Sequence, residues 1–206
     1  MKLFSKIMIV MGVFLFASCI KHEIIPAPEK KVDLPASFSG MLNGSPYELI
    51  KDKDGYRCIA TQAKEILPSP QPSNVIYYSS IESAQKMDLI KISLGKLNFN
   101  PGTDAVPTLN EFKTFFTNNK TPDFMRDGLG GVEIAYRDAQ GNVWLSREDS
   151  TQPQNFVFSS QKQETDEKGD YMKCVAQFNV TLYDDRDAPT DSIVFMNATY
   201  EGYFKR

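Results

Sequence analysis

Histidine is almost absent from this chain, whose 206 residues include only His22. Catalysis by a Ser-His-Asp or Cys-His arrangement needs an imidazole. Zinc and copper sites ordinarily use histidine or clustered cysteine. His22 lies in a proline-rich stretch near the N-terminus, so the chain after that stretch contains no histidine. We therefore expect a protein that is not an enzyme, with no catalytic residue, no cofactor and no metal centre of these classes.

A basic excess and a long apolar run are also missing. The chain has 23 Lys+Arg against 26 Asp+Glu, a net charge of −3, which predicts no nucleic-acid partner. The apolar run at residues 7–16 is shorter than the roughly 20 residues that a transmembrane helix needs. Hydrophobic residues at 41% and aromatics at 12% are typical of a folded, β-rich domain.

The short apolar run is typical of a secretory signal. Lys2 and Lys6 precede this run, and small residues follow it. The segment 16–19, Phe-Ala-Ser-Cys, resembles the lipobox of bacterial lipoproteins. That resemblance implies a lipoprotein signal peptide at 1–18, acylation of Cys19, and the membrane as a partner through those acyl chains. It places the protein in the cell envelope, lipid-anchored at the outer membrane, with periplasmic or surface facing left open.

The segment 19–35 combines the anchor with a proline-rich tether, because three prolines and mixed charges oppose regular packing. From Ala36 the pattern changes to period two, which predicts one β domain over 36–206. Asn43-Gly44 is a strong hairpin signal, since both residues accept positive φ. Thr108 and Glu111 resemble a helix capping box. The expected helix and strands are residues 109–118 and 37–42, 47–51, 57–61, 75–80, 89–94, 132–138, 142–147, 155–160, 173–184 and 192–205.

Nine or ten alternating strands joined by short turns indicate an all-β fold, an antiparallel β-sandwich with one short helix. A lipocalin-like barrel is the alternative. Cys58 and Cys174 both fall on apolar strand faces. They are either a disulfide, as an oxidising compartment permits, or two buried reduced thiols.

Candidate binding residues are few. The carboxylates suggest no catalytic pair. Weak calcium candidates lie in one acidic loop, which is also what a solvated turn looks like: Asp184, Asp185, Asp187 and Asp191. Four aromatic side chains could contact a ligand such as a sugar if they are exposed in a groove: Trp144, Tyr77, Tyr78 and Tyr203.

Five segments together carry a family resemblance: 38–44, 131–144, 154–158, 175–185 and 198–204. They resemble the uncharacterised lipoproteins of about 200 residues common in Bacteroidota. That group looks like an all-β sandwich family with no established activity, so the resemblance implies no functional residue.

Three functions remain open. The first is a non-catalytic binding or interaction module for a glycan, a peptide or an envelope partner. The second is a structural accessory subunit of an envelope assembly. The third is a glycoside hydrolase that uses two carboxylates.

Overall fold

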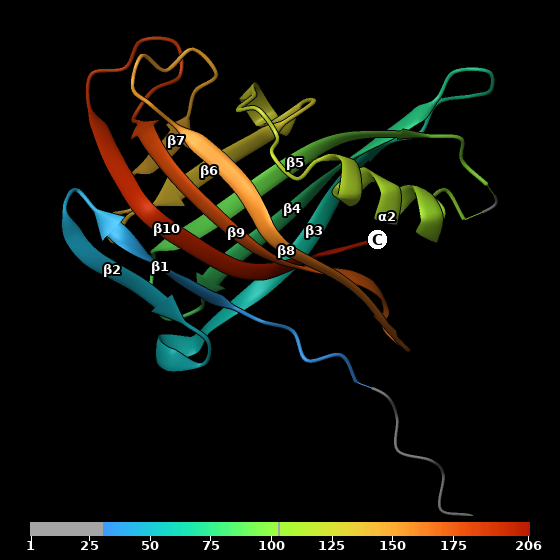
Figure 1. Cartoon of the computed structure of the whole chain (residues 1–206), viewed down its shortest axis with the longest axis horizontal. Helices are drawn as coiled ribbons and strands as arrows, with labels where there is room; N and C mark the ends of the chain where they lie inside the picture. The colour runs from blue at the N-terminus through green and yellow to red at the C-terminus, as the bar shows by residue number, and fades with distance from the viewer. Residues whose placement is uncertain (1–30, 103) are drawn as a thin grey trace, which may run out of the picture. The chain divides into compact units, whose positions relative to one another are not determined.

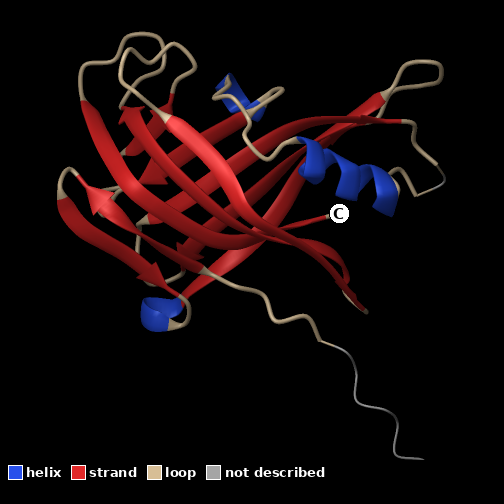
Figure 2. Ribbon diagram, viewed as in Figure 1, coloured by secondary structure: helices blue, strands red, loops and turns tan. Residues whose placement is uncertain are grey.

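Ten strands form one antiparallel sheet in the residues that the computed structural model describes, 31–102 and 104–206. Figure 1 labels the strands, and Figure 2 separates them from the helices and loops. Their bounds are β1 Ser37–Leu42, β2 Ser45–Ile50, β3 Tyr56–Glu65, β4 Ser73–Ser83, β5 Leu89–Phe99, β6 Val132–Arg137, β7 Val143–Ser146, β8 Asn155–Asp166, β9 Gly169–Tyr183 and β10 Ser192–Lys205. One α-helix, α2, spans Leu109–Asn118.

The sheet folds back on itself to make the two layers of a sandwich. Its strand order is β2-β1-β10-β9-β7-β6-β5-β4-β3, and β8 pairs with β9 outside this path. Strands β3 and β4 lie against β10, and Figure 1 shows β10, β9 and β8 crossing in front of β5, β4 and β3. The all-β sandwich prediction is confirmed, and the sheet is not closed into the alternative barrel.

Period-two patterning explains the layers. In β9 the side chains from Cys174 to Val180 alternate between buried and less buried positions, and Thr181 beyond them is buried as well. The turn between β1 and β2 has φ values of 48° at Asn43 and 82° at Gly44, as the Asn-Gly signal predicts. Strands β8 and β9 extend beyond their predicted ends, to Asp166 and back to Gly169. The added end of β8 is polar, so backbone pairing with β9 rather than apolar alternation holds it, whereas the added start of β9 buries Tyr171 and Met172.

Aromatic rings fill the space between the layers. Tyr136 of β6 packs edge-on against Phe195 of β10 at 5.3 Å. Helix α2 buries Phe112, Phe115 and Phe116, and Phe116 lies 5.1 Å from Phe204. The helix begins at the predicted capping box, in which Thr108 Oγ1 accepts from the Glu111 N–H and Glu111 accepts in return from the Thr108 N–H. Within the described ranges, no helix is long and apolar enough to cross a bilayer.

Candidate functional site

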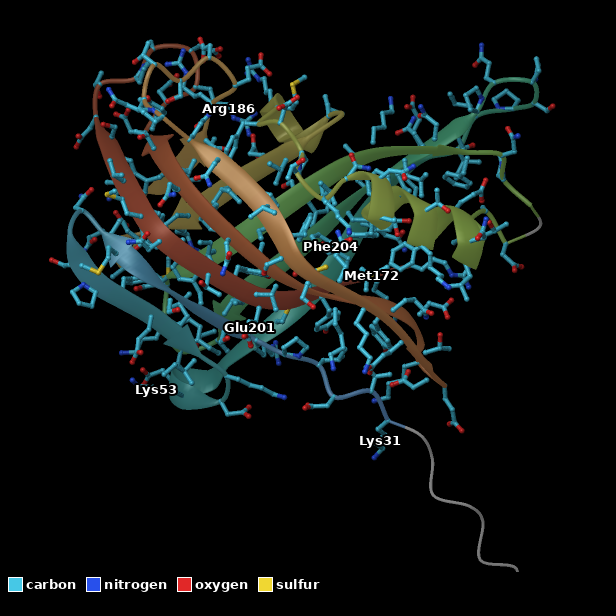
Figure 3. All side chains as sticks on the ribbon, viewed as in Figure 1. Lys31, Lys53, Met172, Arg186, Glu201 and Phe204 are labelled. Carbon is cyan, nitrogen blue, oxygen red and sulfur yellow. The ribbon has the colours of Figure 1, made fainter. Side chains whose placement is uncertain are left out.

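Three loops meet at one end of the sandwich: 119–131 after α2, 147–154 between β7 and β8, and 184–191 between β9 and β10. Arg126 and Asp127 belong to the short 3-10 helix η2 (Arg126–Gly128) in the first loop. Arg186 and Asp187 belong to the third, and Figure 3 shows Arg186 among the loops at this end. We call this region the loop end.

Two crossed ion pairs join η2 to the 184–191 loop. Arg126 Nη1 lies 3.0 Å from Asp187 Oδ1, and Arg186 Nη1 lies 2.6 Å from Asp127 Oδ1. Each pair includes a solvent-exposed partner, so each by itself contributes little stability. Together they fix two loops, distant in sequence, in one relative position.

A buried carboxylate lies beneath these pairs. Glu133 of β6 is only 3% exposed. Its Oε2 accepts from Arg186 Nη2 at 2.6 Å and from the Asp127 N–H at 2.9 Å. Burial raises the pKa of Glu133, while the Asp127 N–H and the Arg186 charge oppose that rise. Glu133 is therefore an anchor for both loops, and the Asp127 N–H and the Arg186 charge both favour its ionised form.

Glycine makes this burial possible. Gly128 has φ +67°, and a Cβ built on it would lie 2.9 Å from the carbonyl oxygen of Ser93 on β5. A larger residue would be strained by its φ and would push η2 away from the sheet. The close approach of η2 to β5 is what covers the face of β6 that carries Glu133.

An arginine-lined pocket of about 250 Å³ opens beside the crossed pairs. Its lining includes Arg126, Arg147 and Arg186. Each guanidinium already has a carboxylate partner, since Arg147 makes two bonds to Asp149, at 2.9 and 2.7 Å. Because carboxylates compensate all three charges, this pocket has no spare positive charge for an anionic ligand.

A larger cleft adjoins this pocket, and the two share Glu148. It has a volume of about 740 Å³, and we call it the loop-end cleft. Its lining combines carboxylates, amides and apolar groups: Asp123, Phe124, Met125, Glu148, Gln154 and Asn155, together with the start of β8.

Two lining residues are held in place by backbone contacts. Glu148 Oε2 accepts from the Arg126 N–H at 3.2 Å. Gln154 Nε2 donates to the carbonyl oxygen of Arg147 at 2.8 Å, and Gln154 Oε1 is buried with no partner among the described residues. The cleft thus presents fixed polar groups beside the exposed side chain of Met125, which is 37% exposed.

The four aromatics predicted to contact a ligand do not form one site. Tyr77 is fully buried, with its ring 5.3 Å from that of Phe112. Tyr78 is half-buried, with Lys91 Nζ 5.4 Å from its ring centroid. Trp144 Nε1 donates to Asp138 Oδ2 at 3.3 Å, and Tyr203 donates to the Cys58 carbonyl at 3.1 Å. None of the four lines the loop-end cleft.

The acidic loop that was a weak calcium candidate forms a turn instead. Asp184 accepts from the Thr190 hydroxyl and from backbone N–H groups of the same loop, which lowers its pKa to about 2. Asp185 accepts two N–H groups of the loop, and Asp191 accepts the next N–H along the chain. Asp187 pairs with Arg126. The described residues contain no cluster of metal-binding side chains.

Cys58 and Cys174 are free and buried, so the structure has the two reduced thiols and not the disulfide. Cys58 Sγ lies 3.4 Å from Ser79 Oγ, which is 2.7 Å from the Tyr200 hydroxyl. Burial raises the pKa of both thiols. The predicted lipidation site, Cys19, lies outside the described residues, as does His22.

Comparison with protein families, curated proteins and solved structures finds no match to this chain. The site rests on its own geometry. The sequence pattern singles out none of the residues that make this site, which are Asp123, Glu133, Glu148, Gln154 and Arg186. One local signal at the loop end is the glycine-rich run 128–131, a pattern that is also typical of a simple turn.

Proposed function

We propose that this protein is a non-catalytic binding module that holds a glycan in the loop-end cleft. The observation that supports this proposal is the lining of the cleft, where carboxylate and amide groups stand beside phenyl and thioether groups. Its volume of about 740 Å³ lies within the range of roughly 300–1,000 Å³ that is typical of small-ligand sites.

The lining chemistry fits a polyhydroxylated ligand. The carboxylates of Asp123 and Glu148 can accept hydrogen bonds from sugar hydroxyls, and the amide nitrogens of Gln154 and Asn155 can donate them. The apolar side chain of Met125 offers contact to the C–H face of a ring. These groups come from loop 119–131 and from loop 147–154 with the adjoining start of β8. The hydrogen bond from the Arg126 N–H to Glu148 joins the two loops, and ion pairs hold the first of them to loop 184–191. Little ordering cost therefore remains for binding.

The proposal includes a lipid anchor on Cys19. An anchored domain with a 19–35 tether would hold the cleft near the membrane without inserting it. Fractionation of cells expressing the Cys19→Ala variant tests this part. We expect the exported variant to leave the membrane fraction, and retention there would refute the anchor.

Calorimetry of the full chain with glycans selected on an array tests the binding function. We expect Glu148→Ala and Gln154→Ala each to weaken binding by about tenfold or more, the value of one lost hydrogen bond to a fixed partner. Glu167→Ala and Gln140→Ala, exposed residues outside the cleft, are the matched controls and should bind as the parent does. Equal binding by all four variants would refute the cleft as the site.

The same experiment tests the glycoside hydrolase alternative. This alternative stays open because the carboxylates of Asp123 and Glu148 line one cleft. A carboxylate pair is the minimum requirement for glycoside hydrolysis. We expect no release of reducing ends from any glycan that binds. Release that disappears in the Glu148→Gln variant would instead assign the protein to the hydrolases.

A further inference from the structure

A second groove continues from the loop-end cleft across the outer face of β8, β9 and β10. We propose that the ligand is a neutral, chain-like oligosaccharide that occupies both, with one part in the cleft and the rest in this groove. The inference rests on the proposed glycan-binding function and specifies its substrate class. We call the second hollow the amide groove, since its polar lining is mainly Asn155, Gln177, Asn179 and Asn197.

The two hollows are continuous. Asn155 and Val157 line both the loop-end cleft and the amide groove. Residue pairing then carries the groove across the sheet, because Val157 lies opposite Gln177 and Gln177 lies opposite Thr199. Three neighbouring strands span about 10 Å at the usual strand spacing. A ligand that filled both hollows would be several sugar units long.

The uncharged lining of the amide groove favours a neutral ligand. The amide groove has a volume of about 340 Å³, and every described residue that lines it is uncharged, in a chain of which 24% is charged. Recognition of a uronate, sulfate or phosphate group relies on arginine or lysine. The nearby arginines of the loop end are already paired with carboxylates. Amides, by contrast, offer the mixture of donors and acceptors that neutral hydroxyl groups require.

The amides of the groove are oriented in advance. Asn155 Oδ1 accepts from the Asn179 N–H at 3.1 Å and from Asn179 Nδ2 at 2.8 Å. Asn179 Oδ1 accepts in turn from the Asn197 N–H at 2.7 Å. This chain of bonds fixes the side chains of Asn155 and Asn179. Preorganised polar groups lose little conformational entropy when a ligand binds.

A β-bulge in β10 lies at the same place. The pairing of β10 with β9 shifts between Phe195 and Ala198, and Asn197 has φ +50°. Bulges of this kind redirect a side chain and are frequent beside binding sites. Here the bulge places Asn197, an exposed residue, in the lining of the groove.

The position of the groove also argues against a peptide ligand. An added peptide strand needs an unpaired sheet edge. The groove crosses β9, whose residues pair with β8 on one side and β10 on the other. Over β9 and β10 the ligand must therefore be recognised through side chains, as a sugar chain is. At β8, which pairs with no strand but β9 among the described residues, the Phe158 N–H already donates to the Lys120 carbonyl oxygen.

A length series of neutral oligosaccharides tests the inference. Calorimetry of the full chain would use glucan and xylan oligomers from the monosaccharide to the hexasaccharide, with the corresponding uronate oligomers beside them. We expect affinity for one neutral series to rise by about tenfold or more with length. In the Gln177→Lys variant this gain should disappear while the shortest bound oligomer binds unchanged. Gln140→Lys, the same change on an exposed turn, should keep the gain.

The outcomes separate the two proposals. If Gln177→Lys keeps the full length gain, or if uronate oligomers or peptides bind more tightly than neutral sugars, the amide groove is not the extension and this inference fails. The loop-end cleft still stands in those cases, provided that Glu148→Ala weakens the binding of short neutral oligomers. If no sugar of any length binds, the proposed function fails as well. Thermal melting confirms that Gln177→Lys is folded, and Thr199→Arg, on the next strand of the groove, is a second variant.

Discussion

Replacing Arg186 with Met would leave the Glu133 carboxylate buried without its cation. Removing one partner of a buried ion pair costs about 3–5 kcal/mol. Glu133 is 3% exposed, but the Arg186 side chain is 20% exposed and Glu133 keeps the Asp127 N–H. We therefore expect the lower end of that range, about 3 kcal/mol at neutral pH. In a domain of this size, this loss lowers the melting temperature by about 6–12 °C.

The pH dependence identifies the cause. Burial already raises the pKa of Glu133 above its ordinary value of 4.5, and loss of Arg186 raises it further. Above pH 4.5 the unfolded chain releases this proton more readily than the folded one, so the unfolding free energy of Arg186→Met falls relative to the parent as pH rises. Below pH 4.5 the carboxyl is protonated in both states, and the destabilisation should shrink.

Urea denaturation of the parent and the variant at pH 4 and pH 7 measures this difference. The double variant Arg186→Met, Glu133→Gln is the matched control, because a Gln side-chain oxygen still accepts from the Asp127 N–H but carries no charge. We expect it to recover most of the lost stability at pH 7. A destabilisation of equal size at both pH values, or no recovery in the double variant, would refute the buried charge as the cause.

Three further predictions concern the core and the helix. Tyr200→Phe removes the hydroxyl that pairs with the buried Ser79, and urea denaturation should show a loss of about 1–3 kcal/mol; no loss would mean that Ser79 finds another partner. Cys58 and Cys174 are buried and have raised pKa values. In a Cys19→Ser chain, neither thiol should therefore react with Ellman's reagent at pH 8 until urea is added. If both stay unreactive in urea, they form a disulfide. Thr108→Ala removes the side chain that caps α2 and should cost about 1 kcal/mol by thermal melting, with Thr117→Ala, inside the helix, as the comparison.

Much of the fold could be predicted because its causes are local. Alternating side chains reveal a strand with one buried face, and Asn43-Gly44 and the Thr108 capping box act over a few residues. Local patterns failed where backbone pairing alone sustains a strand. The end of β8 beyond Ser160 is polar, yet it runs to Asp166 because β9 pairs with it throughout.

The site could not be predicted in this way, because its parts meet only in the folded chain. Arg186 and Asp127 are 59 residues apart in sequence. Glu133 alternates with core residues of β6, so the pattern places it in solvent. It is buried because η2 covers that face, and the sequence shows no periodicity that would predict such a cover. The cleft likewise depends on two loops whose lengths and compositions are ordinary for surface turns.

Few backbone pairs connect the two layers of the sandwich where the sheet passes from β9 to β7. Strand β7 has only four residues, and its pairing with β9 is limited to Leu145 with Tyr183 and Ser146 with Leu182. Amide hydrogens of β7 should therefore exchange with solvent sooner than those of β9 and β10, which pair over most of their length. Glu148 of the loop-end cleft follows β7 by two residues. Separation of β7 from β9 would widen the loop-end cleft. A ligand that contacts both walls of the cleft would oppose this separation and slow the hydrogen exchange of β7.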